Sequence, residues 1–172
     1  GSAATATGKR KENQDCFGWM ALSGGTIIGQ STEGPIGPID NGDNDYLIAV
    51  VCDGMGGMKD GAAASRTMIH ELIGWASNTN VDSADSALSS LVTAISDAED
   101  MIIRDYPGSG TTISLVIVID GKWTSYHVGD SRCYVLTDEG VWRTEDQSPV
   151  EAMFRMGMID EDEMNDHPMS NL

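Results

Sequence analysis

The sequence is short of the features that mark several large classes of protein. Its three cysteines, Cys16, Cys52 and Cys133, form no CxxC pair, and an odd number of cysteines does not suit a disulfide framework. No apolar run approaches the ~20 residues that a membrane-spanning helix needs, and no signal peptide is evident. We therefore expect a protein of a reducing compartment, with a cytoplasmic location and no membrane partner.

Basic residues are scarce as well. Ten lysines and arginines stand against 27 acidic residues, which gives a net charge of −17. Binding to a phosphate backbone requires clustered Lys and Arg, so nucleic acid is not expected as a partner. The acidity has two explanations: it keeps the protein soluble, or part of it binds divalent cations.

What remains is the composition of an ordinary globular protein, with 40% hydrophobic and 22% charged residues and no internal repeat. A length of 172 residues suits a single domain with a real core. Gly1-Ser2 resembles a cloning remnant. We assign residues 1–7 to a disordered start and 8–172 to one domain.

The hydrophobic pattern predicts strands, then two long helices, then more strands. A turn at residues 23–25 joins two short strands, and residues 29–45 are expected to form a long surface loop. The order indicates an α+β fold in which helices cover an antiparallel sheet. Strands are predicted at residues 46–52, 111–119, 122–128, 133–137 and 141–144, and helices at 60–77 (capped by Asp60), 83–105, 149–156 and 161–166.

One segment, AVVCDGMGG at residues 49–57, suggests where chemistry takes place. An apolar strand, which we expect to be buried, ends at Asp53, and Gly54, Gly56 and Gly57 follow. Glycine accepts positive φ and has no Cβ, so the backbone there can turn sharply or approach a ligand. Asp53 is therefore the first candidate for a metal ligand.

Three further segments accompany it: RKENQD, with Arg10 and Asp15; GSGTT at 108–112; and VGDSR, with Asp130. Singly, each has an ordinary explanation as a tail charge, a loop or a tight turn. Together they place three aspartates at strand ends. At ~4 Å and an effective dielectric of ~20, each pair of carboxylates costs about 4 kcal/mol. Cations such as Mg²⁺ or Mn²⁺ would neutralise such a cluster, and Arg10 could hold a phosphate.

The order RxxNxD, DGMGG, SGTT and VGDSR, followed by a flap-like region at 146–172, resembles the metal-dependent protein phosphatase family of the protein phosphatase 2C type, with bacterial members most similar. The resemblance covers nearly the whole chain. It implies an antiparallel β-sandwich flanked by helices. It also implies hydrolysis of phosphoserine or phosphothreonine in phosphoproteins by metal-activated water.

The resemblance also assigns roles to individual residues. Arg10 would bind the substrate phosphate, and Asp53 would bridge two Mg²⁺ or Mn²⁺ ions. The Gly54 carbonyl would ligate one of these ions. Asp15 would hold metal-bound water, and Asp130 would help to bind a third metal.

The chain departs from the family pattern at three points. Met55 stands where many members have a histidine thought to act as a general acid, and Gln14 replaces a common acidic residue. The family's C-terminal strands, which supply two more metal aspartates in DG and DN motifs, have no counterpart here. A catalytically impaired phosphatase-like binding or regulatory module is thus the alternative function, and a homodimer or swapped assembly through an exposed sheet edge is expected.

Overall fold

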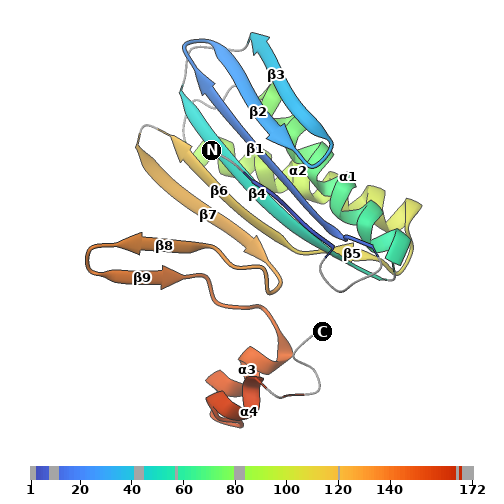
Figure 1. Ribbon diagram of the computed structural model, residues 1–172, viewed down its shortest axis with the longest axis vertical. Coiled ribbons are helices and arrows are strands. Elements are labelled where there is room, and N and C mark those ends of the chain that lie inside the picture. The colour runs from blue at the N-terminus through green and yellow to red at the C-terminus, as the bar shows by residue number, and fades with distance from the viewer. Residues whose placement is uncertain are drawn as a thin grey trace.

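The structure is a computed structural model that describes residues 3–7, 12–40, 45–56, 58–79, 84–119, 121–165 and 167. The predicted fold class is confirmed: the chain is α+β, with an antiparallel sheet flanked by helices (Figure 1). In chain order the elements are β1 (Asp15–Ser23), β2 (Thr26–Ser31), β3 (Gly34–Asp40), β4 (Tyr46–Met55), α1 (Met58–Asn78), α2 (Ala84–Asp105), β5 (Gly110–Thr111), β6 (Ile113–Ile119), β7 (Lys122–Val128), β8 (Tyr134–Thr137), β9 (Gly140–Arg143), α3 (Pro149–Arg155) and α4 (Glu161–Asn165).

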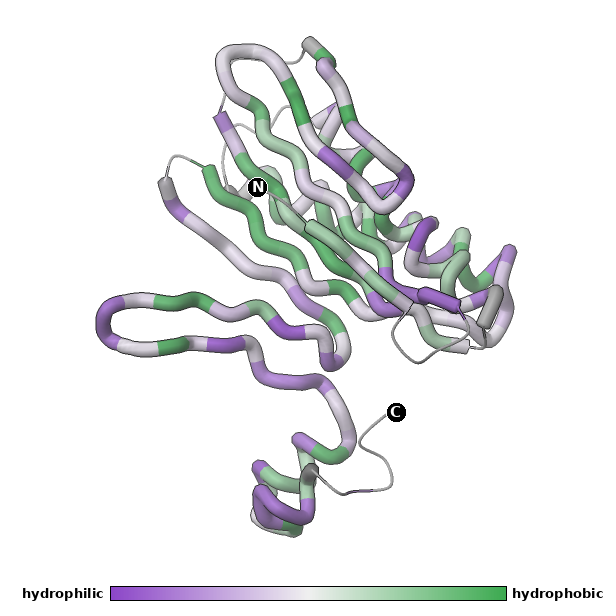
Figure 2. The backbone as a smooth tube through the Cα atoms, in the orientation of Figure 1, coloured by the Kyte–Doolittle hydropathy of each residue, from purple (hydrophilic) through white to green (hydrophobic). Residues whose placement is uncertain are grey.

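The main sheet has the strand order β3-β2-β1-β4-β6-β7, and short β5 pairs with the end of β4. Helix α1 packs on β1 and β4, and α2 packs on α1, so both helices cover the same face (Figure 1). Figure 2 shows that the central strands carry the most hydrophobic stretches of the sheet. The first hairpin turns through Gly24 and Gly25, both at positive φ, as predicted.

Strand β4 shows how the sheet divides its side chains between two faces. Successive side chains of a strand point to opposite sides. Tyr46, Ile48, Val50 and Cys52 point toward the helices and are at most 4% exposed. The intervening residues point away from the helices, and Val51 among them is 48% exposed. The prediction of a strand buried throughout is therefore wrong for the second face.

The hydrophobic core lies between the sheet and the two helices. Leu115, Leu72 and Leu91 are at most 1% exposed there. At the edge of this core the Tyr46 hydroxyl donates a hydrogen bond of 2.6 Å to the carbonyl of Ala76, which fixes the end of α1 to β4. Burial raises the pKa of Tyr46 above its ordinary value. Burial also raises the pKa of the Cys52 thiol, which keeps that thiol protonated and unreactive.

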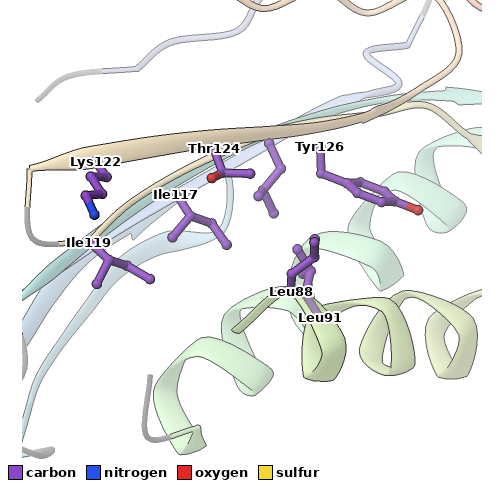
Figure 3. Close-up of a pocket in the computed structure, with 8 residues that line it drawn as sticks. Leu88, Leu91, Ile117, Ile119, Lys122, Thr124 and Tyr126 are labelled. Atoms are coloured by element: carbon purple, nitrogen blue, oxygen red, sulfur yellow. The ribbon is translucent and has the colours of Figure 1, made fainter. Parts of the chain in front are cut away.

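A small gap remains between α2 and the strands β6 and β7. Figure 3 shows Leu88 and Leu91 of α2 pointing toward Ile117 and Ile119 of β6. The volume of this gap is about 10 Å³, which is room for about one water molecule. It is a packing defect and too small for a ligand.

Two predicted boundaries are wrong in informative ways. The loop predicted at 29–45 contains the end of β2 and all of β3, while 41–44 lie outside the described residues. Strand β3 contains Pro35 and Pro38, and proline is tolerated there because β3 pairs with only one neighbour. Helix α1 begins at Met58, so Asp60 lies in its first turn and is not the cap.

The last part of the chain leaves the main sheet. Strands β8 and β9 form a separate hairpin, which touches the sheet through Trp142 and Trp123, whose ring centroids are 5.7 Å apart. Helices α3 and α4 lie beyond this hairpin (Figure 1). Ser148 caps α3 by accepting a hydrogen bond of 3.2 Å from the Glu151 N–H, and Pro149 follows the cap. In the described part of the chain, no helix is long and apolar enough to cross a membrane.

Candidate functional site

Two of the predicted metal ligands lie opposite each other. Asp15 begins β1 and is the direct partner of Asp53 in β4. Opposite residues of an antiparallel pair have Cα atoms about 4.5–5.5 Å apart, and their side chains leave the same face of the sheet. Both aspartates are half-buried, and both lie on the face that points away from the helices. The structure thus brings Asp15 and Asp53 together at one end of the open face.

This arrangement favours a cation. Like charges directly opposite each other on neighbouring strands destabilise a sheet, and a divalent ion between two carboxylates removes that repulsion. Mg²⁺ commonly binds through one or two carboxylates and keeps several waters. Among the described residues no group of three or more His, Cys, Asp or Glu is placed to hold a metal. The pair therefore fits one hydrated ion.

Gly54 lets the end of strand β4, next to Asp53, lie close against helix α1. A Cβ on Gly54 would collide with the carbonyl group of Gly61, so only glycine permits this approach of strand and helix. The Gly54 N–H donates a hydrogen bond of 3.1 Å to the carbonyl of Gln14, and the Ser65 hydroxyl donates one of 2.6 Å to the same oxygen. Gln14, which precedes Asp15, is thereby bonded both to Gly54, which follows Asp53, and to Ser65 of α1.

Thr112 holds the backbone of Asp53 from the other side. Its hydroxyl accepts a hydrogen bond of 2.9 Å from the Asp53 N–H, and its own N–H donates one of 2.9 Å to the Asp53 carbonyl. The Thr111 hydroxyl adds a bond of 3.1 Å to that carbonyl. These contacts interrupt the strand predicted at 111–119, so that β5 ends at Thr111 and β6 begins at Ile113.

The VGDSR segment contacts Thr112 and so lies close to the Asp53 backbone. The hydroxyls of Thr112 and Ser131 are 2.6 Å apart. Gly129 has a φ of +94°, and a Cβ there would lie 2.8 Å from the methyl group of Thr112, so this close turn requires glycine. Asp130 itself is exposed. Its loop lies beside the Asp53 strand, but Asp130 does not join Asp15 and Asp53 in a common cluster of three acidic groups.

An ion pair fixes the far side of this loop. The Arg132 guanidinium donates two hydrogen bonds, of 2.6 and 2.5 Å, to the carboxylate of Asp146. These bonds raise the pKa of Arg132 above its ordinary value, so it stays charged. Arg143 also contacts Asp146, at 3.4 Å.

The GSGTT motif was noted in the sequence but was given no role. Thr112 of this motif, which positions the Asp53 backbone, was therefore missed. Only the pairing of β4 with β5 places it beside Asp53. Asn13, in the RKENQD segment, also has a positioning role, since its side-chain oxygen accepts a hydrogen bond of 3.1 Å from the Asp15 N–H. Arg10, the predicted phosphate ligand, lies outside the described residues, and its role stays a prediction.

We expect Thr112→Val to destabilise the fold by about 1–3 kcal/mol, because it leaves the Asp53 N–H without its acceptor in a closed environment. Thr112 is 3% exposed. Thr93→Val is the matched control, since that hydroxyl bonds only to its own exposed helix, and a change within about 0.5 kcal/mol is expected. Urea unfolding measures both. Equal stability of the two variants would contradict the position assigned to Thr112.

Comparison with known proteins decides the family. The sequence profile of the family described as Protein phosphatase 2C matches residues 36–151, which is more than half of the 172 residues. The chain belongs to the protein phosphatase 2C family. The resemblance seen in its motifs is thereby confirmed.

Bacterial phosphatases of this family are similar to the chain over most of its length. "Serine/threonine phosphatase stp" of Listeria welshimeri is 31% identical over 144 residues, which cover 79% of this chain and 57% of that protein. "Protein phosphatase PhpP" of Streptococcus pneumoniae is 28% identical over 131 residues, covering 72% and 52%. The crystal structure of serine/threonine phosphatase Stp1 from Staphylococcus aureus superposes with a TM-score of 0.79 at 27% identity, covering 98% of this chain and 62% of that one. The chain thus spans somewhat more than half the length of these phosphatases.

Proposed function

We propose that this protein phosphatase 2C chain carries part of a metal-dependent site for the hydrolysis of phosphoserine or phosphothreonine in phosphoproteins. The observation that carries the proposal is the direct pairing of Asp15 with Asp53 at one end of an open sheet face. Similarity to phosphatases named for serine and threonine supports the substrate class.

Each residue near the pair has a defined task in this proposal. Asp15 and Asp53 would hold one Mg²⁺ or Mn²⁺ ion, and the Gly54 carbonyl would be a third oxygen ligand. Such an ion supplies, when bound, an activated water and stabilisation of charge on the transferring phosphoryl group. Arg10 binds the substrate phosphate through its planar fork, and Asp130 belongs to a further metal position.

The protein's own contribution is to hold the two carboxylates still. Thr112 and Thr111 fix the Asp53 backbone, and Asn13 fixes that of Asp15, so that neither carboxylate needs to reorganise during the reaction. Met55 follows at the end of β4 and is 53% exposed. Because methionine cannot donate a proton, the proton for the leaving serine or threonine oxygen must come from water or from another group.

A phosphatase-like binding or regulatory module is the second candidate. It is favoured by the exposed position of Asp130 and by the lack, among the described residues, of three or more His, Cys, Asp or Glu side chains placed to hold a metal. Such a module would still bind an ion or a phosphopeptide but would not turn over substrate. Hydrolysis of an aryl phosphate with Mn²⁺ distinguishes the two functions.

Titration with Mn²⁺ in a calorimeter tests the site itself. We expect weak binding of at most one ion, and Asp15→Asn should weaken it at least about tenfold, because changes to groups around a metal already cost ~10–100-fold. Asp97→Asn, on the exposed surface of α2, serves as the control and should bind as the wild type does. Saturable binding that is unchanged in Asp15→Asn would refute the two-carboxylate site.

A further inference from the structure

The hydroxyl of Thr112 has two hydrogen-bond partners in the described part of the chain, and their chemistry fixes the direction of both bonds. The Asp53 N–H, 2.9 Å away, can only donate, so Thr112 Oγ accepts there. The second partner is the Ser131 hydroxyl, 2.6 Å away. Because Thr112 is 3% exposed, its own proton has to be bonded inside the protein. Thr112 therefore donates to Ser131 Oγ.

Ser131 is thus the acceptor that orients the Thr112 hydroxyl. When the Thr112 proton lies on Ser131 Oγ, a lone pair of Thr112 Oγ is directed at the Asp53 N–H. A hydroxyl that donates one hydrogen bond becomes a better acceptor for another, so the two bonds strengthen each other. We call this chain of Asp53 N–H, Thr112 hydroxyl and Ser131 hydroxyl the hydroxyl relay.

The methyl group of Thr112 is held by the same turn. Gly129 has a φ of +94°, and a Cβ added to it would lie 2.8 Å from that methyl group. The two branches on the Thr112 Cβ therefore contact two residues of one turn, Gly129 and Ser131. Because a β-branched side chain has few χ1 rotamers, this contact at both branches leaves Thr112 a single orientation.

The turn itself is held by the segment that follows β9. Gln147 bonds to Gly129 twice: its N–H donates a bond of 2.9 Å to the Gly129 carbonyl, and its side-chain oxygen accepts one of 3.3 Å from the Gly129 N–H. After Ser131 comes Arg132, which makes two hydrogen bonds to Asp146. Ser131 thus lies between two anchored residues, and the fold sets the position of its hydroxyl.

We infer that Ser131 is a positioning residue for Asp53, acting through Thr112, and that it ties the turn bearing Asp130 to the Asp15–Asp53 pair. The part of this inference that concerns a metal rests on the proposed function, in which Asp130 belongs to a further metal position. Ser131 follows Asp130 directly in the chain. A shift of the turn therefore moves Asp53 as well, through contiguous hydrogen bonds.

Amide hydrogen exchange of the metal-free protein, followed by NMR, tests the relay without any ion. In Ser131→Ala the Thr112 proton loses its acceptor, so the bond to the Asp53 N–H should open more often. Leu115, 1% exposed in the core, is the internal reference, because general destabilisation would accelerate its amide too. The ratio of the Asp53 rate to the Leu115 rate should rise at least about tenfold. Ser131→Thr, which keeps the hydroxyl, should restore the wild-type ratio.

Ser109→Ala is the matched control for this experiment. Ser109 is also half-buried and lies in the same GSGTT segment as Thr112. Its hydroxyl donates a hydrogen bond of 2.7 Å, but to the Tyr106 carbonyl in its own turn. Its removal should leave the ratio of the two exchange rates as it is in the wild type.

Calorimetric titration with Mn²⁺ tests the consequence for the site. Ser131→Ala should weaken Mn²⁺ binding about tenfold, at the low end of the ~10–100-fold cost of changing groups behind metal ligands, because both carboxylates remain. Ser109→Ala and Ser131→Thr should bind Mn²⁺ as the wild type does.

Three results would overturn the inference. An unchanged exchange ratio in Ser131→Ala would remove the relay, and an equal rise in Ser109→Ala would show general loosening of the region. Wild-type Mn²⁺ affinity in Ser131→Ala would sever the link from Ser131 to the metal. A wild-type chain that binds no Mn²⁺ would instead refute the proposed function, and the exchange ratio would still decide whether Ser131 positions Asp53.

Discussion

Asp53→Asn is expected to lower the Mn²⁺-dependent hydrolysis of an aryl phosphate at least about 100-fold, which is more than the ~10–100-fold cost of changing a group behind the metal ligands. Asparagine keeps the size and the backbone contacts of the aspartate, so the hydrogen bonds from Thr112 and Thr111 to residue 53 persist. What is lost is the negative charge opposite Asp15. An initial-rate assay at saturating Mn²⁺ measures the effect.

The control for this measurement is Asp97→Asn, which removes the same charge from an exposed position on the helix layer. Its rate should equal that of the wild type. Equal rates for Asp53→Asn and the wild type would remove hydrolysis as a function of this chain. No hydrolysis by the wild type, together with Mn²⁺ binding that depends on Asp15, would instead select the binding module.

Much of the candidate site could be predicted because its residues stand at ends of apolar strands. The strand at 46–52 and the turn at 23–25 are local signals, and both were readable from sequence. The pairing of Asp15 with Asp53 joins β1 to β4, which β2 and β3 separate along the chain, so its register is fixed by contacts between residues far apart in sequence. The same is true of Thr112, which reaches Asp53 from 59 residues away.

The features that could not be predicted depend mostly on which other elements lie next to a strand in the folded protein. Proline is unfavourable in a strand unless the strand lies at the edge of a sheet. That β3 is such an edge strand is seen only in the assembled sheet. The strand 46–52 was expected to be buried because its residues are apolar. Its outward side chains, such as Leu47 and Val51, show instead an apolar face that neither helix covers.

The site and the open face are parts of one surface. Asp53 and Val51 are alternate residues of β4, so the carboxylate pair begins where the apolar face ends. Strand geometry places their Cα atoms about 6.6 Å apart.

Gly54→Ala is expected to be the most destabilising single-methyl change in this region, lowering the free energy of unfolding by about 3 kcal/mol or more. Overpacking costs ~1–3 kcal/mol where side chains can move aside, but here the new methyl group would meet the backbone carbonyl of Gly61. Strand β4 and helix α1 must then separate, which moves Asp53 relative to Asp15 and also weakens metal binding.

Gly74→Ala is the matched comparison, because it adds the same methyl group to α1 at a position with no neighbour within 4 Å. Replacing glycine by alanine inside a helix should stabilise the protein by about 0.5–1 kcal/mol. The two alanine variants should therefore shift the urea midpoint in opposite directions. Wild-type stability in Gly54→Ala would mean that β4 and α1 do not approach each other as closely as Gly54 and Gly61 indicate. The carboxylate pair would then lack the support that its rigidity depends on.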